Sequence, residues 1–301
     1  MVQAVENSLL DPAHLKGIED YSLLARVVVD GAMPGIHRSL RQGRGNEFFQ
    51  YRPYEQGEDM KVVDWKVFAK RDELVAKTFQ EDTNFTVYLV IDASASMGYH
   101  GQRASCSKLR YANMLAACFA YLAQRQGDRF GLFAYSDQIQ QWIRPQSGSG
   151  HLNRLLASLG TLEAKGENDH EQAWERLSSG LPGRSMVVFL SDFLEAEDTL
   201  SERLRFSLSA RYECLCLQVL DPDEEDLPDA EAIRFAEMEG EREISSSPPA
   251  IRGKYQDDMN AFMENLKAKL ASVSAEFESL RTDRDLGSAL RRFLGMRNRK
   301  A

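Results

Sequence analysis

The sequence has little cysteine, 4 residues in 301, and no long apolar run. Four cysteines are too few for a disulfide scaffold in a chain of this length, and Cys214 and Cys216 lack the second pair that a zinc site needs. No segment approaches the roughly 18 to 20 apolar residues of a membrane-spanning helix, and residues 1–10 lack the basic and apolar regions of a signal peptide. We therefore expect a cytoplasmic protein in a reducing compartment, without a membrane span.

The sequence also lacks an excess of positive charge. The chain has 37 Lys and Arg against 46 Asp and Glu, so its formal net charge is 37 − 46 = −9. Nonspecific nucleic-acid binding draws on clustered positive charge, and this balance argues against it. With 43% hydrophobic residues and only 9 prolines, the composition is that of a folded globular protein. The length fits one domain of roughly 200 residues with an extension.

Three apolar runs rich in β-branched and aromatic residues predict buried strands at Phe85 to Ile91, Met186 to Leu190 and Glu213 to Leu220. Apolar residues at helical spacing predict helices over residues 11–30, 109–124, 152–159, 171–177, 200–208, 255–273 and 285–294. Such alternation predicts an α/β fold with a doubly wound, mostly parallel sheet and helices on both faces. We assign residues 85–301 to this domain and residues 1–84 to an N-terminal extension.

The extension carries more aromatic residues than a linker would, among them Phe48, Phe49, Tyr54 and Trp65. We expect Tyr54 and Trp65 to be core residues that hold the extension on the sheet. Farther along the chain, residues 221–243 are acidic and contain Pro222, which is typical of a solvated loop.

Two of the predicted strands end in acidic residues. Asp92-x-Ser94-x-Ser96 follows the first strand, and Asp192 follows Met186 to Leu190. Ligand sites of open α/β sheets lie at the carboxyl ends of the strands, so these oxygen donors should meet there. They suit a hard divalent ion, Mg²⁺ or alternatively Mn²⁺ or Ca²⁺. We expect the hydroxyls of this loop to be exposed and to contribute little to folding. The competing interpretation is that the two serines cap the next helix and Asp92 binds loop amides without any ion.

The segment FTVYLVIDASASMG resembles the first strand and metal-ion-dependent adhesion site of a von Willebrand factor A domain. The preceding RPYEQGEDMKVVDWKVFAKRDELVAKTF resembles the signature of the bacterial "domain of unknown function 58" proteins, and the resemblance extends from about Gly35 to Leu294. Glu58 and Lys70 depart from that signature. The positions that match it are Arg52, Tyr54, Gly57, Asp59, Asp64, Trp65 and Ala69.

The resemblance implies further site residues and a partner. Asn168, in Gly166-Glu167-Asn168-Asp169, stands where A domains have a metal-binding threonine, and Asp192 stands at the aspartate of a further loop. In A domains a partner's Asp or Glu completes the metal shell. The family is similar to proteins encoded beside MoxR-type AAA+ ATPases, so the resemblance implies such an ATPase as the partner.

Three functional classes remain. The first, which we favour, is a noncatalytic, metal-dependent interaction module that acts as an adaptor. The second is an interaction module with a degenerate metal site, for which Asn168 is the main support. The third is a Mg²⁺-dependent phosphotransferase of the haloacid dehalogenase type, which requires a second aspartate where this chain has Ser94.

The sequence has no G-x-S-x-G motif of a nucleophilic serine and no glycine-rich phosphate-binding loop. His100 and His170 are expected in surface or loop roles.

Overall fold

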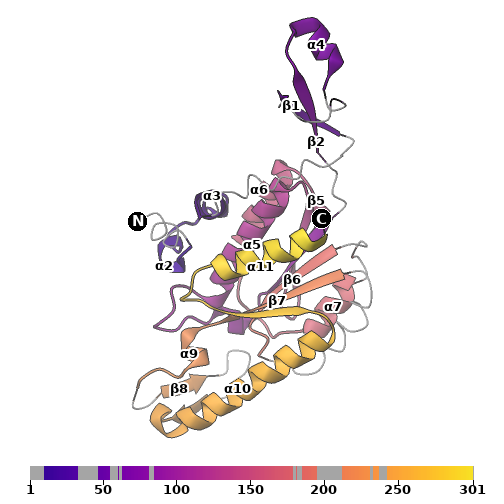
Figure 1. Ribbon diagram of the computed structural model, residues 1–301. Helices are drawn as coiled ribbons and strands as arrows, with labels where there is room; N and C mark the ends of the chain where they lie inside the picture. The colour runs from indigo at the N-terminus through magenta and orange to yellow at the C-terminus, as the bar shows by residue number, and fades with distance from the viewer. Residues whose placement is uncertain are drawn as a thin grey trace.

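A computed structural model describes residues 10–32, 47–54, 63–80, 85–178, 185–194, 212–230, 233–236 and 243–300, with residues 60 and 181. Its centre is a six-stranded sheet in the order β10-β7-β6-β3-β4-β5 (Figure 1). The strands are β3 (Thr86–Asp92), β4 (Arg129–Tyr135), β5 (Ile139–Gln146), β6 (Ser185–Ser191), β7 (Tyr212–Leu220) and β10 (Glu276–Arg281). All pairings are parallel except that of β5, the antiparallel edge strand. The predicted α/β fold is therefore confirmed.

The central strand β3 is buried along its whole length. Its side chains alternate between two apolar clusters, Leu89 and Ile91 in one and Tyr88 and Val90 in the other. Both faces of the strand are covered, so the sequence needs no polar residue at every second position. The uninterrupted apolar run follows from this double burial.

Helices cover both faces of the sheet. On one side α5 (Lys108–Arg125) packs with α6 (Ser149–Leu159) and α11 (Gly287–Lys300), and Phe119 stacks on Phe293 with ring centroids 4.6 Å apart. The other side is covered by α7 (His170–Ser178) and α10 (Pro248–Ser272), which contribute Ala173 and Leu266 to the second cluster. The sheet is thus the middle of three layers.

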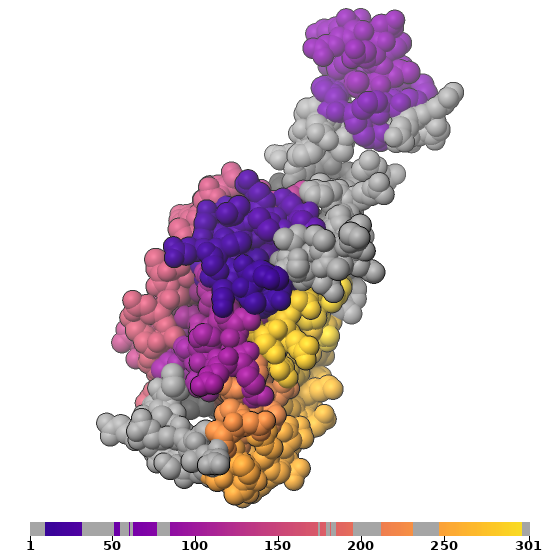
Figure 2. All heavy atoms as spheres, turned by 90° about the vertical axis from the view of Figure 1, so that its left-hand side faces the viewer, coloured from indigo at the N-terminus to yellow at the C-terminus, as the bar shows by residue number. Residues whose placement is uncertain are grey.

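The predicted helix over residues 11–30 is two helices, α2 (Pro12–Leu15) and α3 (Tyr21–Ala32). The break has a local cause, because the Asp20 carboxylate accepts a hydrogen bond from the Ser22 amide at 2.7 Å and so starts a new helix. Leu24 and Val28 of α3 are fully buried in the domain core. Figure 2 shows these indigo helices lying against the body of the domain. This part of the extension packs on the domain, as expected.

The rest of the described extension forms a small lobe from β1 (Glu47–Pro53), α4 (Trp65–Arg71) and β2 (Val75–Gln80), hereafter the β1–β2 lobe. The two strands pair antiparallel, and Figures 1 and 2 show the lobe at one end of the molecule, away from the sheet. None of the side chains of α4 is buried. The side chains of the lobe that the structure describes belong to neither core cluster around the sheet.

Trp65 is not a core residue, which corrects our expectation. Its side chain is 50% exposed and meets the ring of Phe68 edge-on, while Tyr54 is only half-buried. The reason is geometric, because two strands and one short helix offer too little apolar surface to cover an indole ring.

The chain between β7 and β10 contains a short helix α9 (Pro222–Glu225), the strand pair β8 (Ile233–Ala236) and β9 (Glu243–Ser246), and then α10. The helix predicted over residues 200–208 lies outside the described residues. All four cysteines are buried and unpaired. Across the described ranges, no helix combines the length and apolarity needed to cross a membrane.

Candidate functional site

The loop after β3 begins with a buried carboxylate. Asp92 is fully buried, and its Oδ1 accepts a hydrogen bond from the Ser94 amide at 2.9 Å. This bond turns the chain sharply into a short 3₁₀ helix, η3 (Ala95–Gly98). The Ser94 and Ser96 hydroxyl oxygens then lie 3.1 Å apart. Ser94 is buried and Ser96 is half-buried. This corrects our expectation that the loop hydroxyls are exposed.

Asp192 reaches the same place from the neighbouring strand. β6 pairs in parallel with β3, so the carboxyl ends of the two strands coincide. The chain runs from β3 to β4 on one side and returns to β6 on the other, which makes this the point where strand order reverses. The Ser96 hydroxyl donates to Asp192 Oδ2 at 2.8 Å. The predicted meeting of the two acidic loops is therefore present in the structure.

A third loop brings Asn168 to the site. Its amide nitrogen donates to Asp92 Oδ2, which also accepts a 2.6 Å hydrogen bond from the Ser191 hydroxyl. The loop is held against η3 by a 2.9 Å hydrogen bond from the Ala95 amide to the Gly166 carbonyl. Gly166 has a φ of +78°, a conformation that favours glycine. The five residues singled out from the sequence thus lie at one site, at the carboxyl ends of the central strands. They are Asp92, Ser94, Ser96, Asn168 and Asp192.

Lys108 is a site residue that the sequence analysis missed. It is the first residue of α5 and is fully buried. Its ammonium Nζ lies 2.7 Å from Asp192 Oδ2 and 2.5 Å from Glu224 Oε1. A cation in the first turn of a helix opposes the helix dipole, and this unfavourable position was the signal available in the sequence.

The two aspartates at the site differ in ionisation. Burial and the neighbouring Asp192 carboxylate raise the pKa of Asp92 to about 7. Burial opposes ionisation of Asp192 as well, but the Lys108 ammonium outweighs it and lowers the pKa of that carboxyl. One lysine thus serves Asp192 and Glu224 together, and Asp92 has no cation in direct contact among the contacts described.

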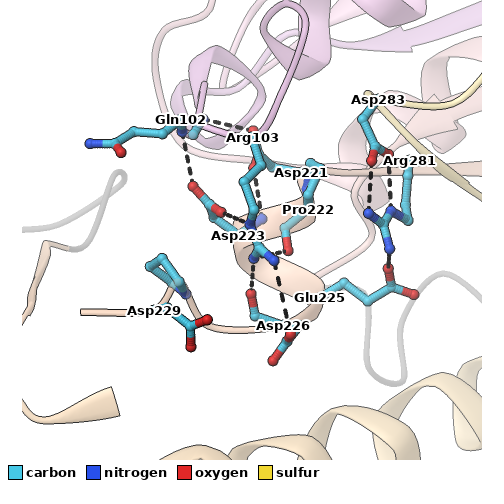
Figure 3. A network of polar contacts seen from close by, with 12 residues as sticks. Gln102, Arg103, Asp221, Pro222, Asp223, Glu225, Asp226, Asp229, Arg281 and Asp283 are labelled. Atoms are coloured by element: carbon cyan, nitrogen blue, oxygen red, sulfur yellow. Dashed lines mark hydrogen bonds and ion pairs between the residues drawn. The ribbon is translucent and has the colours of Figure 1, made fainter. Parts of the chain in front are cut away.

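The acidic segment 221–243 is not simply a solvated loop, which corrects our expectation for its first part. Asp221 and Asp223 are buried, and they accept hydrogen bonds from the Gly101 and Gln102 amides at 2.7 and 2.9 Å. The Arg103 guanidinium also pairs with Asp223, as Figure 3 shows. These bonds attach the chain that follows η3 to the carboxyl end of β7.

Two more arginines hold the same segment from α10 and β10. Arg252 pairs with Asp226 at 2.8 Å and Asp229 at 2.7 Å, and Arg281 pairs with Glu225 at 3.0 Å, the last of these drawn in Figure 3. Within residues 221–230, Asp223, Glu225, Asp226 and Asp229 therefore each have an arginine partner.

His170 is buried, not on the surface. Its Nδ1 lies 2.5 Å from the Tyr135 hydroxyl and its ring stacks on Phe193. Burial lowers the pKa of His170 to about 4, so the ring is neutral near pH 7. His100 is exposed, with Nε2 3.3 Å from the Ala104 carbonyl oxygen. Neither contact pairs a histidine with a serine of the site.

The oxygen donors gathered at the site suit some metal ions and not others. Two carboxylates, two hydroxyls and one amide oxygen are hard ligands, which fits Mg²⁺, Mn²⁺ or Ca²⁺ and not zinc or copper. Within the described residues, no group of three His, Cys, Asp or Glu side chains is placed to hold a metal ion. An ion at this site would therefore depend on the hydroxyls and on the amide as well as on the two carboxylates.

The chain is similar to proteins of mycobacteria. It is 28% identical over 296 residues to uncharacterized protein Rv1480 of Mycobacterium tuberculosis, covering 97% of this chain and 92% of that protein. The uncharacterized protein Mb1516 of Mycobacterium bovis matches with the same identity and coverage.

Solved structures resemble the chain more distantly. BatB, a conserved hypothetical protein from Bacteroides thetaiotaomicron, matches with a TM-score of 0.49 and 15% identity, over 70% of this chain and 98% of that one. The VWA domain of SpRpn10 matches with a TM-score of 0.42 and 12% identity, over 66% and 89%. The family model described as "Protein of unknown function DUF58" matches residues 50–264, more than half of the chain. The chain therefore belongs to the DUF58 family.

Proposed function

We propose that this protein is a noncatalytic interaction module whose binding face is the carboxyl edge of the sheet, completed by a divalent ion such as Mg²⁺, Mn²⁺ or Ca²⁺. The observation that carries the proposal is the meeting of Asp92 and Asp192. Asp92 accepts a bond from the Ser94 amide, the Ser94 and Ser96 hydroxyls contact each other, and the Ser96 hydroxyl donates to Asp192. Asn168 would supply its amide oxygen from the third loop, at the position where the resemblance places a threonine, while its amide nitrogen donates to Asp92.

The charge at the site supports a cation. When Asp92 is ionised, Asp92, Asp192 and Glu224 carry three negative charges against the single positive charge of Lys108. Burial and the Asp192 carboxylate oppose that ionisation, and they raise the pKa of Asp92 to about 7. Excess negative charge is costly in a buried site, and a divalent ion would balance it. The same burial makes the ion's attraction to the carboxylates stronger than it would be in water.

The contacts of Asp92 argue against a phosphotransferase. A nucleophilic aspartate needs a free carboxylate oxygen that faces substrate. Here Asp92 is fully buried, and its two oxygens accept bonds from Ser94, Asn168 and Ser191. An aspartate-based phosphotransferase also needs a second acid two residues after the nucleophile, where this chain has Ser94. For both reasons we infer a noncatalytic role.

The proposed partner is a protein that presents an Asp or Glu to the ion, and the resemblance names a MoxR-type AAA+ ATPase. An octahedral shell has about six positions, more than these side chains fill, so one would stay exchangeable. A carboxylate there gains a charge-assisted contact that a neutral side chain does not replace.

A metal-free interaction module is the second candidate, and the position of Lys108 favours it. Its ammonium already contacts Asp192 at 2.7 Å, so this carboxylate has a counter-ion without any metal. In that case the same edge of the sheet would bind its partner through hydrogen bonds and charge alone.

Binding to a MoxR-type ATPase, measured with and without EDTA at two salt concentrations, separates these candidates. We expect EDTA to weaken binding and added Mg²⁺ to restore it. Ser272→Ala serves as a control, because its hydroxyl donates to the Lys269 carbonyl of its own helix. This helix, α10, ends there just before the amino end of β10, whereas the site lies at the carboxyl ends of the strands. Affinity that falls with salt and ignores EDTA would instead establish the metal-free interface.

A further inference from the structure

Lys108 lies between two carboxylates that come from different parts of the chain. Its side chain has no exposure to solvent, and those of Asp192 and Glu224 are only 4% and 18% exposed. The ammonium of a lysine has three donors, and two of them are directed at these oxygens. Removing such a buried cation would leave two carboxylates facing each other without compensation.

The oxygen that Lys108 contacts is also part of the candidate metal site. Asp192 Oδ2 accepts both the lysine bond, at 2.7 Å, and the Ser96 hydroxyl bond, at 2.8 Å. A divalent ion held by Ser96 and Asp192 would therefore stand close to the ammonium. Two cations that share one carboxylate repel each other strongly where water is excluded.

We propose that Lys108 is a built-in counter-ion that competes with a divalent ion for Asp192 and so lowers the affinity of the site. The inference rests on the proposed function, since it concerns the same ion. Without the ion, Lys108 neutralises Asp192 and keeps the loops together. With the ion, the attraction between Lys108 and Asp192 weakens, and Glu224 becomes the principal partner of the ammonium.

Glu224 is well placed for that exchange. Its Oε1 contacts Lys108, while its Oε2 accepts a 2.9 Å bond from the Asp221 amide as part of the capping box of α9. Its backbone carbonyl accepts a 2.5 Å bond from the Tyr255 hydroxyl of α10. The glutamate is thus fixed by its own helix and its neighbour, and it stays available to hold the ammonium whichever way Asp192 is paired.

Two substitutions should shift ion affinity in opposite directions. Lys108→Met removes the competing charge and keeps an unbranched side chain of similar length. Glu224→Gln removes the second carboxylate, so the ammonium is left to Asp192 alone, while a glutamine oxygen still caps the helix. Lys108→Met should tighten Mg²⁺ binding at least roughly tenfold, and Glu224→Gln should weaken it.

The test is calorimetric titration of Mg²⁺ into the full chain and both variants, with thermal unfolding recorded with and without the ion. We expect Lys108→Met to unfold at a lower temperature than wild type without Mg²⁺ and to gain more from adding it. Detectable binding in Lys108→Met alone would also support the counter-ion role. Wild type that binds Mg²⁺ no more weakly than Lys108→Met would overturn this inference and leave the proposed function standing. Absence of binding in all three proteins would overturn both.

Discussion

The Ser96 hydroxyl donates a 2.8 Å hydrogen bond to the Asp192 carboxylate, across 96 positions of sequence. This bond joins the loop after β3 to the loop after β6, at the place where the strand order of the sheet reverses. The candidate site therefore depends on two loops whose relative position is set by the parallel pairing of their strands.

Replacing the two loop serines should weaken both ion binding and folding. We expect Ser94→Ala with Ser96→Ala to reduce Mg²⁺ affinity strongly, because two hard ligands are lost. The hydroxyls are buried or half-buried, so the free energy of unfolding should also fall, by about 1 kcal/mol for each lost hydrogen bond. Calorimetric titration and denaturant unfolding measure the two effects, and unchanged Mg²⁺ affinity would contradict this assignment.

Trp65→Ala should have little effect on global stability, because the indole is half-exposed and lies in the β1–β2 lobe. Phe119→Ala is the matched comparison. Its ring is fully buried against Phe293, and its loss should cost about 3 to 5 kcal/mol. Denaturant unfolding of both variants provides the measurement. Comparable losses in the two variants would mean that Trp65 supports the domain core after all.

Gly101→Ala should destabilise the protein. A Cβ at this position would lie 2.3 Å from one oxygen of Asp223 and 2.5 Å from one of Asp221, so the attachment of α9 must shift. Gly253→Ala is the control, because its Cβ would meet nothing within 4 Å and alanine favours the helix α10. In thermal unfolding, the melting temperature of Gly101→Ala should be lower than that of wild type, and that of Gly253→Ala should be equal to it or higher. Equal melting temperatures for the two variants would refute the predicted steric clash.

His151 should make stability depend on pH. Its Nε2 bonds the Phe130 carbonyl at 2.7 Å, and its Nδ1 lies 3.0 Å from Arg154, an arrangement that suits a neutral ring. Burial lowers the pKa of His151 below its ordinary value of 6.5, so the unfolded chain takes up this proton first. Its contribution to stability is present above pH 6.5 and is lost as the pH falls through the folded pKa.

The measurement is denaturant unfolding of wild type and His151→Gln at pH 7.5 and 5.5. Wild type should lose more stability between the two values than the variant, whose side chain does not titrate. Equal losses would show that other groups account for the pH dependence.

Much of the fold followed from apolar periodicity, because β3, β6 and β7 are covered on both faces and their sequences record that burial directly. The gathering of Asp92 and Asp192 was also predictable, since parallel neighbours end at the same edge. The first-turn position of Lys108 was a sequence signal that something neutralises it, but its partner was not predictable. Glu224 of α9 lies 116 positions away, and no local pattern encodes that contact. The expected burial of Trp65 was wrong, because the presence of an aromatic residue does not say whether the surrounding structure has enough apolar surface to cover its ring.

The most direct test of the central claim is the anomalous diffraction of crystals of the full chain soaked in millimolar Mn²⁺. We expect an anomalous peak among Asp92, Ser94, Ser96, Asn168 and Asp192, at the carboxyl edge of the sheet. Well-diffracting crystals with no peak at that position would contradict it.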